Sequence, residues 1–302
     1  MSTGSQAEDD ERSVQSHPDI DPIRPLLAGE REAARRACAA HADCVTALYG
    51  GAEIGDREHL RILFNPFVVD PDWNLGVVPT PIPEDWPAAL GQLRRELISR
   101  NRRPTVLLDS RDPEALAAFP GESWEEAFRF SGLIYPASRE TPTARFPDDV
   151  EVVEYEPEEA PVEDIADVFE AAFGTAVEEG LDPGYRNGIA AGLERAARVL
   201  GGPRLRSTVV REGGVAAGIG FRVQVGTVVG LYNLGVSPAF RGRRLGGAIT
   251  EQRVARARAE GAETVFLLTE DPRVEASQIK RGFVPGFELL GLTERSANSR
   301  GQ

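Results

Sequence analysis

Residues 231–250 read LYNLGVSPAFRGRRLGGAIT, and this stretch decides which fold the sequence predicts. Its apolar start is typical of a strand, which we expect to end at Val236 before a short turn. A loop rich in glycine and arginine then leads directly into a helix. The first N–H groups of a helix lack partners within it, and the helix dipole adds partial positive charge there. The stretch therefore predicts a pyrophosphate site, to which Arg241 and Arg243 would add charge-assisted hydrogen bonds.

Apolar periodicity predicts regular elements on both sides of this loop. We expect strands at 150–155, 206–212, 215–225, 227–236, 264–269 and 283–292, and helices at 161–173, 182–200, 243–260 and 271–281. Asp182 is typical of an N-cap, and Gly213 with Gly214 predicts a two-residue hairpin turn. The order β-α-α-β-β-β-α-β-α-β indicates an α/β fold, with a mixed sheet flanked by helices.

The first half of the chain is a weaker copy of the same plan. We expect helices at 31–42, 84–99 and 124–129, and strands at 45–49, 60–64 and 105–109. The apolar run TVLLD at 105–109 resembles TVFLLT at 264–269. These similarities predict an internal duplication, with domains at 23–140 and 148–295 joined by a polar segment. Residues 1–22 are expected to be a disordered tail and 296–302 a short second tail.

Composition restricts the classes of function. The 302 residues carry a net charge of −14, which disfavours nucleic acid as a partner and weakly favours a neutral or cationic substrate. No apolar run is long enough to span a bilayer, and the N-terminus lacks a signal-peptide pattern, so we expect a cytoplasmic protein without membrane contact. The spacing of Cys38 and Cys44 matches no zinc site, and we expect two buried thiols and no metal.

The stretch 241–246, RGRRLG, resembles the acetyl-CoA motif Gln/Arg-x-x-Gly-x-Gly/Ala of the GNAT superfamily of N-acetyltransferases. Arg241 and Gly246 match the motif, whereas Arg244 stands where the family has its inner glycine. The departure is mild, because backbone N–H groups are the main phosphate donors of such a loop. The similarity covers the element order of residues 150–292 and extends in degraded form over the first half. It implies tandem GNAT folds, each with a central, mostly antiparallel sheet flanked by helices.

The resemblance also implies how a coenzyme would be held. The pantetheine arm of acetyl-CoA would lie between two diverging strands, and a backbone N–H near residues 234–236 would polarise the thioester carbonyl. An amine would attack the thioester directly in a ternary complex, so that no nucleophile of the enzyme is needed. The implied coenzyme-binding residues are Leu234, Gly235, Val236, Arg241, Gly242, Arg243, Arg244, Leu245, Gly246 and Gly247.

Two proton-transfer roles remain after this assignment. Many relatives place a tyrosine four residues before a Gly-Phe pair to protonate the leaving thiolate, but this chain has Gln278 there. Glu270 and Tyr232 are the candidates for the general base, and Asn233 is a candidate for orienting the substrate. Each has a structural alternative, since Glu270 could cap the next helix and Tyr232 could be a packed aromatic residue.

The first half lacks the features of a coenzyme site. At the corresponding place, residues 77–85 read VVPTPIPED, with no glycine or arginine, three prolines that cannot donate and two acidic residues. We expect this half to buttress the catalytic half or to form a wall of the acceptor pocket. The compact loop at 70–74, DPDWN, offers Trp73 for that wall, with a packed surface turn as the alternative.

The sequence thus predicts an enzyme that moves an acetyl or other short acyl group from acetyl-CoA to a primary amine of a small-molecule metabolite. It would act as a monomer or a homodimer. The alternative is a CoA-binding sensor or scaffold without turnover, which Gln278 keeps open. A relative that uses aminoacyl-tRNA is disfavoured by the Arg-Gly loop and by the acidic charge balance.

Overall fold

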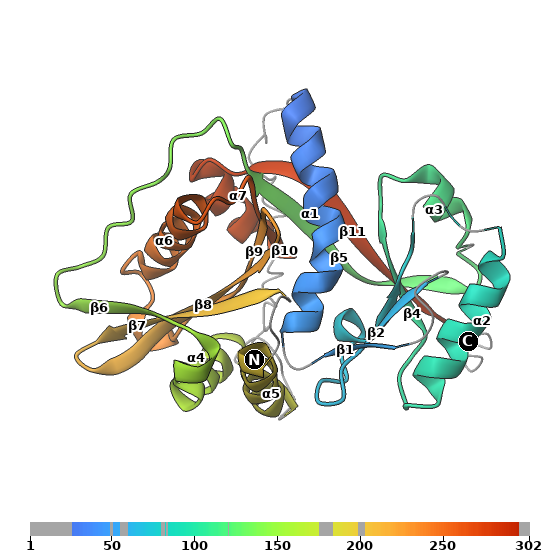
Figure 1. Ribbon diagram of the computed structural model, residues 1–302, viewed down its shortest axis with the longest axis horizontal. Helices are drawn as coiled ribbons and strands as arrows, with labels where there is room; N and C mark the ends of the chain where they lie inside the picture. Colours follow the sequence, from blue (N-terminus) through green and yellow to red (C-terminus); the bar gives the residue numbers. More distant parts are fainter. Residues whose placement is uncertain are drawn as a thin grey trace, which may run out of the picture.

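The computed structural model describes residues 26–48, 51–54, 60–79, 82, 84–119, 121–174, 184–198 and 203–295. Within these residues, eleven strands form one sheet in the order β1-β2-β3-β4-β11-β5-β10-β9-β8-β7-β6. Figure 1 shows helix α1 crossing the middle of this sheet, with α2 and α3 toward one end and β6 and β7 toward the other. The predicted tails at 1–22 and 296–302 lie outside the described residues.

The N-terminal half begins with the long helix α1 and ends with the long strand β5. Its elements are α1 (Ala28–Ala47), β1 (Ala52–Ile54), β2 (Arg61–Phe64), the 3-10 turn η1 (Pro71–Trp73), β3 (Leu75–Val77), α2 (Trp86–Ile98), β4 (Thr105–Asp109), α3 (Pro113–Ala117) and β5 (Trp124–Tyr135). Short elements such as β1, β3 and α3 carry too few residues for their periodicity to be recognised in the sequence.

The C-terminal half follows the predicted element order. It consists of β6 (Val150–Tyr155), η2 (Pro157–Glu159), α4 (Val162–Phe173), α5 (Gly184–Arg198), β7 (Arg204–Glu212), β8 (Val215–Val225), β9 (Val228–Val236), η4 (Pro238–Phe240), α6 (Leu245–Ala259), β10 (Thr264–Thr269), α7 (Pro272–Lys280) and β11 (Val284–Glu294). Gly213 and Gly214 form the predicted hairpin turn, with φ of 57° and 82°. The predicted cap Asp182 lies outside the described residues.

Each half contains one parallel strand pair joined by a helix. In the N-terminal half β3 runs parallel to β4 with α2 between them in the chain, and in the C-terminal half β9 runs parallel to β10 with α6 between them. Parallel neighbours need such a crossover, because a tight turn can only reverse the chain. The stretches TVLLD and TVFLLT, which looked alike in the sequence, are the second strands of these two units, β4 and β10.

The two halves exchange their last strands. Strand β5 of the N-terminal half lies between β10 and β11 of the C-terminal half and is antiparallel to both. Strand β11 of the C-terminal half in turn lies between β4 and β5 of the N-terminal half. The two predicted sheets are therefore merged into one, and the position of β10 depends on a strand from the other half.

Both faces of the merged sheet are covered. Helices α1, α4 and α5 contribute to one core, in which Cys44, Phe169 and Phe287 are buried together. Helix α6 packs on the other face, where Val254 and Ala257 lie in a cluster with buried residues of β5, β9 and β10. Helix α2 covers a separate core over β2 and β4. Because the first two cores combine residues of both halves, apolar burial joins the halves in addition to the strand pairing.

Two of the predicted elements in the first half are wrong. The segment predicted as a strand at 45–49 continues α1 through Ala47, because Val45 extends the apolar helical face formed by Ala37 and His41. The segment predicted as a helix at 124–129 is the beginning of β5, which pairs with β11. Backbone pairing with a distant strand overrides local preference there, and sequence periodicity does not report that pairing.

The two cysteines are free, and Cys44 is fully buried. Burial raises the pKa of both thiols to about 12, so that neither is ionised near neutral pH. In the part of the chain that the structure describes, no helix combines the length and apolar character needed to cross a membrane.

Candidate functional site

The glycine- and arginine-rich loop lies between β9 and α6, as predicted. A hollow of about 350 Å³ opens beside it and is lined by Val236, Phe240, Arg241, Gly242, Arg244, Leu245 and Gly246. The first intrahelical bond of α6 is made by the N–H of Ala248, which donates to the carbonyl of Arg244 at 3.2 Å. The N–H groups of the three preceding residues, 245–247, have no partner within the helix and point along its axis. This is the arrangement that binds anions.

Arg244, at the place of the family's inner glycine, has a left-handed backbone with φ of 64°. This conformation is strained for residues with a Cβ and unstrained for glycine. It also explains why α6 begins at Leu245 and not at Arg243, since a left-handed residue cannot belong to a right-handed helix. The substitution therefore keeps the turn that a glycine would make, at the cost of backbone strain.

The arginine side chains of the loop contact protein groups in this structure. Arg241 donates to the carbonyl oxygens of Val236 and Ala172, at 3.2 and 3.0 Å. Arg243 forms ion pairs with Asp149, at 3.2 Å, and with Glu212. The backbone amides are thus the donors that need no rearrangement to meet a phosphate, whereas Arg241 and Arg243 would first have to change partners.

Gly247, in the first turn of α6, leaves room for the side chain of Arg281 from the end of α7. A Cβ built on Gly247 would lie 2.7 Å from Nε of Arg281. The guanidinium is held there by the carbonyl and hydroxyl oxygens of Ser277, at 2.8 and 2.6 Å. The glycine thus allows a cation to sit over the helix N-terminus.

Strands β9 and β10 pair only over the first part of β9 and then diverge. Their last paired residues are Leu231 and Leu267, although β10 remains paired with β5 as far as Thr269. On its other side, β9 continues along β8 to Val236. Backbone groups of residues 232–236 therefore have no partner from β10, and this open edge is where an extended ligand can bind like an added strand.

A β-bulge shapes that open edge. Ile219 pairs with Gly235 and Phe221 pairs with Tyr232, so that Asn233 and Leu234 together oppose the single residue Gly220. Asn233 has φ of 49°, a left-handed value that asparagine tolerates better than most residues. The bulge turns the side chains of two consecutive residues, Tyr232 and Asn233, toward the same face of the sheet.

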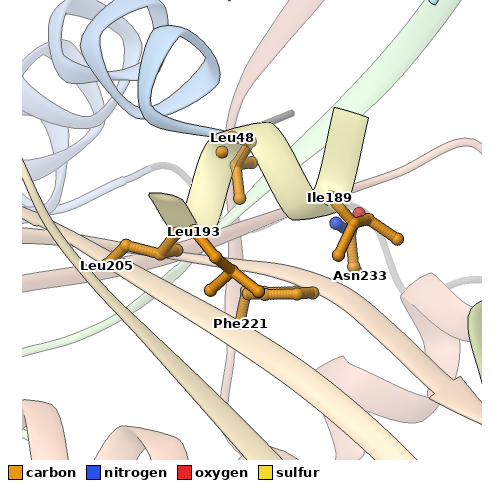
Figure 2. A pocket seen from close by; sticks show the side chains of 7 residues that line it. Leu48, Ile189, Leu193, Leu205, Phe221 and Asn233 are labelled. Carbon is orange, nitrogen blue, oxygen red and sulfur yellow. The ribbon is translucent and has the colours of Figure 1, made fainter. Parts of the chain in front are cut away.

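The carboxamide of Asn233 lies at a small cavity of about 10 Å³, which is room for one water molecule. Figure 2 shows it among apolar side chains from the C-cap of α1 and from α5, β7 and β8: Leu48, Ile189, Leu193, Leu205 and Phe221. Its Nδ2 atom is buried and has no hydrogen-bond partner among the described residues. A buried donor without a partner is costly, so this amide is available to a bound molecule.

Tyr232 is held within the core under α1. Its hydroxyl is 2.9 Å from Nδ1 of the buried His41, and the two rings are stacked with centroids 6.0 Å apart. Burial raises the pKa of Tyr232 well above its usual value and lowers the pKa of His41 to about 4, so both are neutral at pH 7. The hydroxyl therefore serves the contact between the two halves, as the packed-aromatic alternative expects.

Glu270 follows the last residue of β10 and does not cap the next helix. The cap of α7 is Asp271, whose carboxylate accepts from the N–H of Arg273 at 2.8 Å. Burial raises the pKa of Glu270, although part of its side chain is exposed. No hydrogen bond or ion pair of the Glu270 carboxylate occurs among the described residues, which leaves it free to accept a proton.

Glu270 lies close enough to an aspartate of the other half, Asp72, for its charge to raise the pKa of that residue. Burial raises the pKa of Asp72, in η1, to about 7, with further contributions from the charges of Asp70 and Glu270. The 3-10 turn is held rigidly, because Tyr185 of α5 donates to Asp70 at 2.6 Å and accepts from the indole of Trp73 at 3.2 Å. The loop expected to contribute Trp73 to an acceptor pocket thus also brings a carboxyl group that titrates near neutral pH.

Gln278, at the position of the usual tyrosine, is buried within α7. Only 4% of its side chain is exposed, and its Oε1 atom has no hydrogen-bond partner among the described residues. A carboxamide has no acidic proton to give to a departing thiolate. Its N–H groups can still donate hydrogen bonds.

Comparison with known proteins agrees with this geometry. Residues 165–279 match the model of the acetyltransferase (GNAT) family, which places α4 through most of α7 in one family domain. The stretch 165–279 therefore belongs to the GNAT family of acetyltransferases, and the class of reaction of this family is acyl transfer. No curated protein matches the sequence.

Solved structures show the same fold at low sequence identity. A GCN5-related N-acetyltransferase from Kribbella flavida matches with a TM-score of 0.62 at 17% identity, covering 88% of this chain and 96% of the other. A tandem GNAT protein from the clavulanic acid biosynthesis pathway, solved without acetyl-CoA, has a TM-score of 0.57 at 16% identity, with 78% of each chain covered. A GCN5-related N-acetyltransferase from Sphaerobacter thermophilus gives 0.55 at 13%, covering 90% and 94%. These structures thus share the fold across most of the chain.

Proposed function

We propose that this protein transfers an acetyl or other short acyl group from acetyl-CoA to a primary amine of a small molecule, by direct attack in a ternary complex. The observation that carries the proposal is the arrangement of β9 and β10. These strands diverge beside a helix N-terminus with free N–H groups, and carboxyl groups lie beyond the end of β10. One end of the gap is suited to a diphosphate and the other to an amine.

The hollow at α6 fits the diphosphate of the coenzyme. Backbone N–H groups of residues 245–247 would donate to the phosphate oxygens, and Arg281 would add positive charge nearby. The open edge at 232–236 would bond the pantetheine arm. Bound there, acetyl-CoA supplies the activated acyl group, and a backbone N–H of the bulge would polarise its thioester carbonyl.

The acidic groups favour an amine that arrives as an ammonium ion. Asp70, Asp72 and Glu270 bring three carboxyl groups together, and burial, followed by the charges of Asp70 and Glu270, raises the pKa of Asp72. A bound ammonium would offset this repulsion and lower that pKa. One carboxylate, Glu270 or Asp72, would then take the proton so that the free amine can attack. Asn233 would orient the acceptor through a water molecule, since the cavity at its unpaired N–H has room for only one.

A binding module without turnover remains the second candidate, because Gln278 cannot protonate the thiolate. Acetyl-CoA would bind in both cases, so binding alone does not separate the two functions. Thiolate is nevertheless a tolerable leaving group, since an ordinary thiol has a pKa of about 8.5. The enzyme proposal therefore requires no general acid.

The test combines a melting-temperature assay with thiol detection. We expect acetyl-CoA to raise the melting temperature, and the double variant Arg241→Glu, Gly246→Glu to abolish the rise through repulsion and blockage at the hollow. We expect the wild-type protein to release free CoA thiol with at least one cationic amine of a panel, and Asp72→Asn to reduce the rate. Glu122→Gln, an exposed carboxyl of the same half, is the matched control. A clear melting shift without thiol release for any amine would support the binding module instead.

A further inference from the structure

The buried arginine of α6, Arg253, is not used by the mechanism above. It lies on the face of α6 that packs on the sheet, one turn after Ile249 and one turn before Ala257, and only 1% of it is exposed. A second buried arginine, Arg222, is bonded by two carboxylates, Glu154 and Glu260. No ion pair of Arg253 is present among the described residues, so it is a buried cation without a salt-bridge partner.

Arg253 contacts the sheet at the β-bulge. Its Nη1 atom donates to the carbonyl oxygen of Phe221 in β8 at 2.8 Å and to that of Tyr232 in β9 at 2.9 Å. One nitrogen atom thus joins the two strands at the pair where their register shifts. The carbonyl of Tyr232 directly precedes Asn233, so the contact fixes the peptide unit from which the bulge starts.

The residue opposite the bulge is adapted to this contact. A Cβ on Gly220 would lie 2.8 Å from both Cζ and Nη1 of Arg253, which is closer than real Cβ atoms come. Glycine at this position therefore leaves the space that the guanidinium occupies. A glycine in β8 and an arginine in α6, which are far apart in the chain, thus both contribute to the contact at the β9 bulge.

A purely structural explanation accounts poorly for this arrangement. Burying a guanidinium without a salt-bridge partner is expensive, and replacing a buried charge by apolar residues of similar volume is often neutral or stabilising. Burial lowers the pKa of Arg253 to about 9, against an opposing contribution from the charge of Glu154, and the group is still cationic at neutral pH. A cation at this place would stabilise negative charge that develops nearby during a reaction. The oxygen of a thioester carbonyl bound along residues 233–236 would develop negative charge when the amine attacks.

We propose that Arg253 is a positioning residue for acyl transfer: it holds the β9 bulge so that the backbone N–H groups after Tyr232 are aligned on the thioester oxygen, and its charge favours the oxyanion. This proposal rests on the proposed function. Arg253 binds no coenzyme group itself, because it is buried between α6 and the sheet. Its loss should therefore affect the chemical step more than coenzyme affinity.

The test uses the full-length protein and three variants at this contact. Arg253→Met removes the charge and both hydrogen bonds, Arg253→Lys keeps the charge, and Gly220→Ala displaces the guanidinium while leaving the arginine in place. We expect kcat to fall about 10- to 100-fold in Arg253→Met, somewhat less than for direct loss of an oxyanion donor. Gly220→Ala should also lose activity, Arg253→Lys should recover part of it, and the Kd for acetyl-CoA should change less than about threefold.

Two controls separate this role from general destabilisation. Arg256→Met alters an exposed arginine of the same helix, and Arg222→Met breaks a buried ion network next to Phe221 but leaves both hydrogen bonds of Arg253 in place. Both should keep the wild-type kcat at temperatures where they are folded. If Arg253→Met also keeps the wild-type kcat, or if Arg222→Met loses as much activity as Arg253→Met, the proposal is wrong.

Amide hydrogen exchange provides a readout that does not depend on turnover. We expect Arg253→Met to accelerate exchange at residues 232–236 relative to Arg256→Met, because the bulge loses its link to β8. Unchanged exchange in this segment would overturn the positioning role even if the wild type shows no activity. Absence of turnover in the wild type, together with accelerated exchange in the variant, would instead refute only the proposed function.

Discussion

Replacing Asp72 by asparagine should stabilise the protein at alkaline pH while impairing its activity. The pKa of this carboxyl is raised from 3.8 to about 7 by burial and by the charges of Asp70 and Glu270. Because the folded state holds the proton more tightly than the unfolded chain does, the folded state binds more protons between about pH 4 and pH 7. The free energy of unfolding therefore falls as pH rises through this range and levels off above about pH 7.

The size of the effect follows from the pKa difference. A shift of about 3 units corresponds to about 4 kcal/mol at 1.36 kcal/mol per unit. Partial exposure of the side chain to solvent reduces this value, and we expect about 2 kcal/mol. Asp72→Asn should gain that much over the wild type at pH 8 and considerably less at pH 5, where the wild-type carboxyl is largely protonated in the folded state.

Urea denaturation at pH 5 and pH 8 measures this difference directly. Glu122→Gln, which removes an exposed carboxyl, is the control and should show little change at either pH. An equal stability gain for Asp72→Asn at both pH values would mean that Asp72 does not titrate within this range. A loss of stability at pH 8 would show that its carboxylate has a cationic partner, and the account of the acceptor site would then be wrong.

Three further predictions follow from the same structure. Arg244→Gly should raise the free energy of unfolding by about 1 kcal/mol, because glycine adopts the left-handed conformation without strain, and should retain coenzyme binding; no gain in urea denaturation would contradict the strain. Gly132→Ala should cost about 1–3 kcal/mol, since its Cβ would lie 2.6 Å from the ring of Phe287, whereas Gly121→Ala meets open space and should be nearly neutral. The kcat/KM for the amine should rise with pH through about 7 as Asp72 loses its proton, and a rate profile that is flat there would exclude Asp72 as the base.

The sequence was most informative where structure is local. The loop at 241–246 could be recognised because a strand, a turn and a helix N-terminus are consecutive in the chain, and the buried strands β4 and β10 were predicted with their observed bounds. Helix α6 starts two residues later than predicted because the left-handed turn at Arg244 is a backbone property that residue type alone does not reveal.

Features that depend on distant partners could not be predicted in the same way. The exchange of β5 and β11 depends on which strands pair with each other. The periodicity of residues 124–129 does not indicate that they form a strand paired with β11. The proximity of Asp72 to Glu270 likewise results from the packing of the two halves. Arg253 has a recognisable signal only in retrospect, as a charged residue on the apolar face of α6 between Ile249 and Ala257.

The location of the bound coenzyme tests the central claim most directly. We expect a crystal structure with acetyl-CoA to show the diphosphate within hydrogen-bond distance of the N–H groups of residues 242–247, and the acetyl group between residues 232–236 and the end of β10, pointing toward Asp72 and Glu270. Density for the coenzyme at any other place, or none at saturating concentration, would contradict the account.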